Sequence, residues 1–245
     1  MTTFAGKPGG PGAFDGWRQA ARFQVPRGIW GDGTFLYVSD NQTIRRVEIG
    51  TGFVNTIAGA PYILNYADGK GSEARLNNPG PLWGDGTNLY VVDTRLIRKV
   101  TLATREVTTI AGDPLSYGID DGIGANARFM DLRGISGDGR YLYVTESNSN
   151  RVRRIAIDSG EVTTVAGEFG KRGSEDGIGS AAHFTAPAGI WSDGKNIYVS
   201  EVATIRKLAP VSAATPVSNL VWELISPASA RFRSIYQAVE SKFGG

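Results

Sequence analysis

The chain has 245 residues, which is enough for one domain of ordinary size or for two small ones. Lysine and arginine together number 26 and aspartate and glutamate 24, so the net charge of +2 gives no strong attraction to nucleic acid or to an acidic membrane. Cysteine is absent and His183 is the single histidine, which excludes a disulfide scaffold, a thiol nucleophile and a histidine cluster for metal binding or catalysis within one chain.

Three markers recur along the chain in one register. They are the aspartates of a Trp-Gly-Asp-Gly type turn at 32, 85, 138 and 193, Ala-Gly pairs at 5–6, 58–59, 111–112 and 166–167, and Asp-Gly pairs at 15–16, 68–69, 121–122 and 176–177. Each marker therefore repeats at spacings of 53, 53 and 55 residues. A shared period of this size indicates a repeat architecture.

One unit shows which structure repeats. In the second unit, short runs rich in β-branched and aromatic residues cover 81–83, 88–93, 97–102 and 106–110, and turn residues separate them. Asp-Gly between two such runs is a strong hairpin signal. Each unit is thus predicted to be a four-stranded antiparallel meander of 53 to 55 residues, and radial stacking of the sheets predicts an all-β propeller of four blades.

The two ends of the repeat region indicate how the four blades could close into a ring. Residues 2–6 match the last strand of a unit, which favours a closed four-bladed ring with an N-terminal strand clasp, although residues 215–221 stand where the fourth blade's own last strand belongs. The alternatives are a fragment or half of a ring made by two chains. The propeller is assigned to residues 1–221.

Residues 222–245 are predicted to form a short helical tail. Ser226 and Pro227 suit the start of a helix, and apolar side chains then follow on one face, at Phe232, Ile235, Tyr236, Val239 and Phe243. The helix could pack on the propeller, could join copies into a homo-oligomer, or could lie on a membrane surface. No apolar run reaches the ~18 residues of a membrane-spanning helix, and residues 1–6 lack the pattern of a signal peptide.

The string Pro-x-Gly-Ile-Trp-x-Asp-Gly-x-x-Leu-Tyr-Val-x-Asp, followed by Ile-Arg-Arg/Lys-Val, resembles the NHL-repeat family of β-propellers. It fits residues 26–47 and 79–100, and fits 132–155 and 187–208 with small departures. The linking segments resemble those of bacterial, extracellular-type members, which implies an extracellular or cell-surface location. The resemblance implies the fold, whereas propellers of this kind host binding proteins, scaffolds and a few enzymes.

One carboxylate per unit follows the Tyr-Val strand, at Asp40, Asp93, Glu146 and Glu201. A ring of such acids near the axis could hold a cation such as Ca²⁺ through oxygen ligands. The same acids could instead form structural ion pairs with Arg45, Arg98, Arg153 and Arg206, which also occur once per unit. The cation interpretation would make the protein a lactonase or hydrolase type of enzyme, as some propellers that resemble this fold are.

The segments that link the units keep their frame but change their content. Variable loops with aromatic side chains on a rigid frame are typical recognition sites. The ligand-binding candidates are Trp17, Tyr62, Tyr66, Tyr117, Phe169 and Arg172. The alternative is that the aromatic side chains pack between neighbouring blades.

A tryptophan register runs through Trp30, Trp83 and Trp191, with Ser136 in the third unit. These side chains could bind sugars or fill the central channel. His183 replaces the arginine found at 22, 75 and 128, and we interpret it as drift of the repeat. The sequence predicts a non-enzymatic module for protein or carbohydrate recognition, with no cofactor and no nucleic-acid partner. A structural subunit that self-associates is the further alternative.

Overall fold

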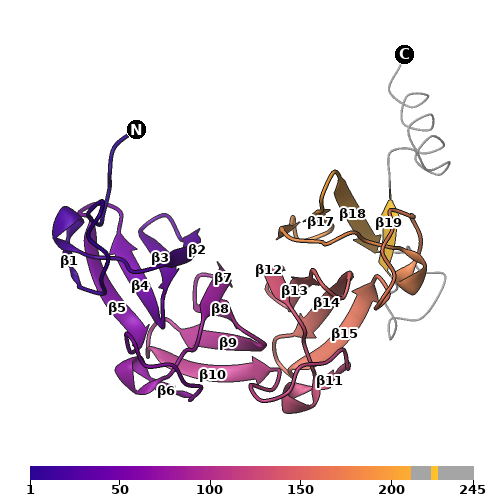
Figure 1. Cartoon of the computed structure of the whole chain (residues 1–245), viewed down its shortest axis with the longest axis horizontal. Helices are drawn as coiled ribbons and strands as arrows, with labels where there is room; N and C mark the ends of the chain where they lie inside the picture. Colours follow the sequence, from indigo (N-terminus) through magenta and orange to yellow (C-terminus); the bar gives the residue numbers. More distant parts are fainter. Residues whose placement is uncertain (211–221, 226–245) are drawn as a thin grey trace.

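The computed structural model describes residues 1–210 and 222–225, with side chains described for 1–210. Within these described residues almost all regular structure is strand, and the helices are single 3₁₀ turns of three residues, which are too short to cross a membrane. The strands form four antiparallel sheets, one per sequence repeat, which stand side by side along an arc (Figure 1). The predicted all-β organisation is confirmed, and the described residues contain four sheets.

Each sheet is a meander in chain order. The first contains β2 (Pro26–Gly31), β3 (Phe35–Asp40), β4 (Thr43–Glu48) and β5 (Phe53–Gly59). The second contains β7 (Pro79–Gly84), β8 (Asn88–Asp93), β9 (Leu96–Thr101) and β10 (Glu106–Ala111). The third contains β12 (Leu132–Gly137), β13 (Tyr141–Glu146), β14 (Arg151–Ala156) and β15 (Glu161–Ala166). The fourth contains β16 (Ile190–Ser192), β17 (Ile197–Ser200), β18 (Ile205–Pro210) and β19 (Trp222–Ile225).

The first three sheets carry a fifth strand of two residues that the sequence did not predict. These strands are β1 (Gly16–Trp17), β6 (Gly69–Lys70) and β11 (Gly122–Ile123), and each pairs with the outermost strand of its sheet. The aspartate before each strand holds it in place. Asp15, for example, accepts hydrogen bonds from the Thr56 N–H at 3.0 Å and the Thr56 hydroxyl at 2.9 Å.

The Asp-Gly turns form as the sequence indicates. Asp32 Oδ1 accepts the N–H groups of Thr34 at 2.8 Å and Phe35 at 2.7 Å, and Gly33 adopts φ +92°, where a Cβ would be strained. Tyr37 donates its hydroxyl to the other carboxylate oxygen at 3.1 Å. The turn thus fixes the hairpin of β2 and β3 and also orients the tyrosine of β3.

The hydrophobic core lies between sheets. Successive residues of a strand point to opposite faces, so Tyr37 packs toward the second sheet while Leu36 and Val38 face the other way. Buried clusters fill the interfaces between the first and second, second and third, and third and fourth sheets. Among the described residues, no such cluster joins the fourth sheet to the first.

The predicted closed ring is therefore wrong, because the four sheets form an open arc (Figure 1). Among the described residues the predicted N-terminal clasp is also not formed, since Ala5 packs against the cluster of the first repeat that includes Ala21 and Val38. The fourth sheet ends with β19, so Trp222–Ile225 of the predicted tail extend the sheet. The predicted last strand at 215–221 and the predicted helix with Phe232, Ile235, Tyr236, Val239 and Phe243 lie outside the described residues.

Candidate functional site

The four repeated carboxylates lie in separate sheets, and each pairs with its own arginine. Asp40 and Arg45 lie 3.1 Å apart, Asp93 and Arg98 3.2 Å, Glu146 and Arg153 2.8 Å, and Glu201 and Arg206 2.7 Å. No group of three or more acidic or histidine side chains converges on one point in the described part of the chain. The predicted cation site remains a prediction, and these ion pairs argue against it.

Each carboxylate also holds the chain segment that leads into its sheet. Asp93 accepts the N–H of Asn77 at 3.0 Å and that of Asn78 at 2.7 Å. Burial raises the pKa of Asp93, and these two N–H groups together with Arg98 oppose that rise. The arrangement is a buried structural junction that the repeat copies from blade to blade.

The tryptophan register lies at the interfaces between sheets. Trp30 stacks on Tyr37 with ring centroids 5.9 Å apart, and Trp83 stacks on Tyr90 at 5.8 Å. Ser136 is buried, whereas Trp191 is 60% exposed. The rings at 30 and 83 therefore serve as packing elements, and Trp191 has no equivalent cover from the described residues.

The six predicted loop residues do not form one site. Trp17 contacts Phe53 with ring centroids 4.7 Å apart, Tyr62 and Phe169 are exposed, and the Tyr66 hydroxyl accepts a hydrogen bond from the Asn77 side-chain amide at 2.6 Å. Tyr117 lies under the Arg95 guanidinium, 5.4 Å from it to the ring centroid.

Arg172 lines a hollow of about 190 Å³ between the third and fourth repeats, together with Asn148 and Asn150. On the same linking segment as Arg172, His183 Nδ1 lies 3.1 Å from the Glu175 carboxylate. Neither place brings a nucleophile and a base together in a way that would support hydrolysis.

A larger hollow of about 460 Å³ opens at the inner side of the arc, where the first three repeats meet. Its wall comes from the start of β2, β7 and β12 and from the turn after β8. It includes three arginines, Arg27, Arg95 and Arg133, and one aspartate, Asp131. The hollow is therefore electropositive.

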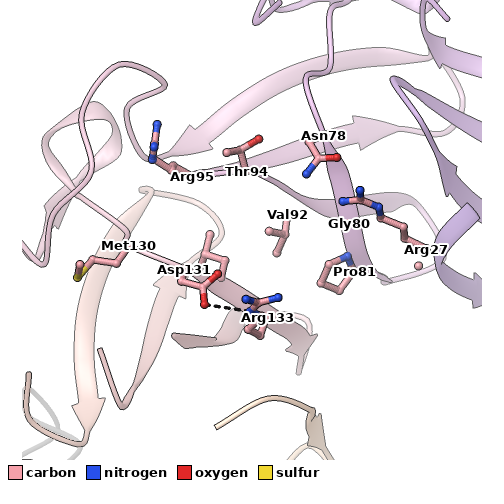
Figure 2. Close-up of a pocket in the computed structure, with 12 residues that line it drawn as sticks. Arg27, Asn78, Gly80, Pro81, Val92, Thr94, Arg95, Met130, Asp131 and Arg133 are labelled. Atoms are coloured by element: carbon pink, nitrogen blue, oxygen red, sulfur yellow. Dashed lines mark hydrogen bonds and ion pairs between the residues drawn. The ribbon is translucent and has the colours of Figure 1, made fainter. Parts of the chain in front are cut away.

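The arginines of the hollow differ in how they are held (Figure 2). Arg133 Nε donates to Asp131 at 2.9 Å, and Arg95 lies at the rim above the Tyr117 ring. Arg27 is exposed and makes no ion pair or side-chain hydrogen bond with another described residue; its guanidinium turns toward Asn78. A guanidinium with free donors is suited to an anionic oxygen pair.

Sequence reasoning missed these arginines, although a signal was present. Arg27 and Arg133 occupy one repeat position, where the second and fourth units have Gly80 and Ala188. Arg95 lies in the turn after β8, three residues before Arg98, and the other units have Gln42, Asn150 and Ala203 at this place. The site is thus marked by residues that differ from the repeat and lie on one side of the arc. The residues that recur in every unit mark it less well.

Comparisons with known proteins agree with this fold. No family model matches the chain. The chain is 27% identical over 178 residues to NHL repeat-containing protein 2 of Bos taurus, which covers 65% of this chain and 24% of that protein. It is 26% identical over 143 residues to the Homo sapiens protein of the same name, which covers 54% and 20%. The chain thus spans about a quarter of the length of the curated relatives it matches.

Solved structures match the chain at low sequence identity, and one of them has a similar fold by TM-score. A streptogramin B lyase matches with a TM-score of 0.51 and 13% identity, over 84% of this chain and 56% of that one. An auxiliary nutrient binding protein from Bacteroides thetaiotaomicron matches with a TM-score of 0.48 and 15% identity, over 94% and 65%. The repeat strings, the four meander sheets and the similarity to the curated relatives together support an NHL-repeat β-propeller family for this chain.

Proposed function

We propose that this protein is a non-enzymatic binding module and that its ligand places an anionic group in the hollow lined by Arg27, Arg95 and Arg133. The observation that carries the proposal is the arginine set itself. Three guanidinium groups from three repeats line one hollow of about 460 Å³, with a single carboxylate among them. A structural role for Arg27 finds no support, because no described residue pairs with it.

The physical basis is the usual one for anion recognition. Guanidinium groups bind carboxylate, sulfate or phosphate oxygens through two parallel hydrogen bonds. Asn78 and Thr94 add polar side chains to the same wall. The sheets on either side supply a rigid frame, so little conformational freedom is lost on binding.

We favour a binding function over a cation-dependent hydrolase because the repeated carboxylates already have partners. The four acids that would hold a cation already neutralise arginines in their own sheets. The ligand could be an acidic protein segment or an acidic glycan, since both present carboxylate oxygens. An extracellular or cell-surface location remains a prediction from the repeat resemblance.

The experiment is equilibrium binding of fluorescent probes to the purified chain. A glutamate-rich peptide and an oligogalacturonate supply carboxylates from the two sources, and a neutral oligosaccharide is the control probe. We expect one of the charged probes to bind and the double variant Arg27→Gln/Arg133→Gln to lose that binding. Arg105→Gln, which removes an arginine outside the hollow, is the matched control. Equal binding by both variants would refute the proposal.

A further inference from the structure

The two end sheets each have a face that the repeat normally buries. Ile205 of β18 is 76% exposed, whereas Ile97, at the equivalent position in the second sheet, is fully buried against the third. Ile29 of β2 is 62% exposed, whereas its equivalent Leu82 is 7% exposed against the first sheet. We name the side of the fourth sheet with Trp191, Ser200 and Ile205 the outgoing face. The side of the first sheet with Ile29, Gly31, Leu36 and Val38 is the incoming face.

The internal interfaces show what an outgoing face contacts. The ring of Trp30 lies against Gly84 of the next sheet, where an added Cβ would come within 2.7 Å of it. Trp83 and Gly137 repeat this relationship at 2.6 Å. A tryptophan on one sheet therefore requires a glycine on the next.

The third interface lacks both members of this pair at once. Ser136 replaces the tryptophan and Ser192 replaces the glycine, and the Ser192 N–H donates to the Ser136 hydroxyl at 3.0 Å. The fourth sheet then returns to tryptophan at Trp191, and the first sheet has glycine at Gly31. The outgoing and incoming faces of the chain thus carry the two matched halves of one interface.

A serine hydroxyl at one repeat position gives independent evidence that the outgoing and incoming faces match. Ser39 accepts the Gly28 N–H at 2.8 Å and donates to the Gly80 carbonyl of the next sheet at 2.7 Å. Ser200 is its equivalent and accepts the Gly189 N–H at 3.0 Å. No described residue lies beyond Ser200 to accept its proton. The carbonyl at the repeat position of Gly80 is that of Arg27, on the incoming face.

The edge of β18 offers a third match. β19 pairs with Lys207–Pro210, so Ile205 and Arg206 have no strand partner on that side among the described residues. In the first sheet, the equivalent Ile44 pairs with Ala58. Ala5 is the repeat equivalent of Ala58, and it already packs on the incoming face. If the first sheet of another chain docked here, its N-terminal segment with Ala5 would therefore supply a strand for the open edge of β18.

We infer that the outgoing face binds the incoming face of a second copy of this chain, head to tail. Both faces belong to this chain and match each other in packing, hydrogen bonding and strand edge, which is why the occupant is another copy. Such a contact is heterologous, so copies form a ring where the rotation closes and a longer assembly where it does not. In this assembly the predicted N-terminal clasp acts between copies.

The test begins with the mass of the full chain in solution by light scattering over a range of protein concentrations. We expect multiples of the chain mass that rise with concentration. The outgoing-face variant Trp191→Ser/Ile205→Glu and the incoming-face variant Phe4→Glu/Ile29→Glu should each be monomeric. All four side chains are exposed, so the fold should be retained, which circular dichroism checks. Leu115→Ser, at a site 89% exposed on a linking segment, is the matched control and should assemble as the parent does.

Mixing the two variants distinguishes a head-to-tail contact from any symmetric one. Each variant keeps one intact face, and the two intact faces are complementary, so the mixture should give a one-to-one dimer that neither variant forms alone. A parent chain that is monomeric at every concentration would overturn the inference. So would an assembly that both variants retain, or a mixture that stays monomeric.

Discussion

Arg98 Nη1 lies 3.2 Å from Asp93 Oδ2, and both side chains are completely buried. The other terminal nitrogen of Arg98 reaches Asp68 Oδ1 at 3.0 Å and the carbonyl of Ala67 at 2.9 Å. One side chain thus joins the second sheet to the linking segment that precedes it. The same junction recurs around Arg45, Arg153 and Arg206.

Arg98→Met should destabilise the protein strongly, because it leaves the Asp93 carboxylate buried without its cation. Removal of one partner of a buried ion pair costs about 3–5 kcal/mol. The free energy of unfolding in urea, followed by tryptophan fluorescence, measures the loss. Lys99→Met, at the next residue of the same strand, is the control, with an expected change within about 0.5 kcal/mol. Equal effects of the two variants would contradict a structural role for the pair.

Tyr37 gives a prediction about alkaline pH. Burial, with the hydrogen bond to Asp32, raises the pKa of Tyr37 to about 12 from its ordinary value of 10.0. Between these values the unfolded chain releases the phenolic proton and the folded chain retains it, so stability falls as the pH rises. A two-unit difference in pKa corresponds to about 2.7 kcal/mol.

Unfolding experiments at several pH values between 9 and 12 (about the span of the tyrosine titration) check this prediction. Tyr37→Phe should reduce the slope of stability against pH in this window, since it removes the titrating group. Tyr62→Phe, which removes an exposed hydroxyl, should leave the slope as it is in the parent. A parent chain with no loss of stability in this window would contradict the assignment.

Gly84→Ala should destabilise the interface between the first and second sheets. The added Cβ would lie within 2.7 Å of the Trp30 ring, and overpacking of this kind costs about 1–3 kcal/mol. Gly50→Ala, where nothing lies within 4 Å, is the matched control. Urea unfolding measures both.

The double variant Trp30→Ser/Gly84→Ser reproduces the pair that nature uses at Ser136 and Ser192. We expect the double variant to lose less stability than the sum of the losses of Trp30→Ser and Gly84→Ser, because the serine at 30 removes the clash with the serine at 84. Additive losses in the double variant would show that the two positions are not coupled.

The sequence predicts much of the fold because its signals are local. The Asp-Gly turns, the alternating strands and the acid and arginine of each unit lie within one repeat, and the structure confirms the all-β organisation. The two-residue strands at Gly16–Trp17 and its equivalents have no alternating run and form only because Asp15 holds them. The open arc depends on the angle between sheets, which arises from many side chains at once.

The candidate site was less accessible to prediction. Arg27 and Arg133 are separated by two repeats in the sequence, and only the curvature of the arc brings them to one hollow. The predicted loop aromatics spread over separate linking segments because each segment follows its own sheet. Tyr117 alone of these aromatics reaches the rim of the hollow, through Arg95.

Asp131→Asn should strengthen the binding of an anionic ligand in the hollow. The Asp131 carboxylate forms an ion pair with Arg133 at 2.9 Å, and its negative charge repels the negative charge of a ligand nearby. At a solvated distance of about 4 Å a unit charge contributes about 1 kcal/mol, so affinity should rise about fivefold. The gain should shrink as sodium chloride is added, because the hollow is open to solvent. Arg27→Gln should weaken the same probe, and equal shifts in one direction for both variants would contradict an electrostatic site.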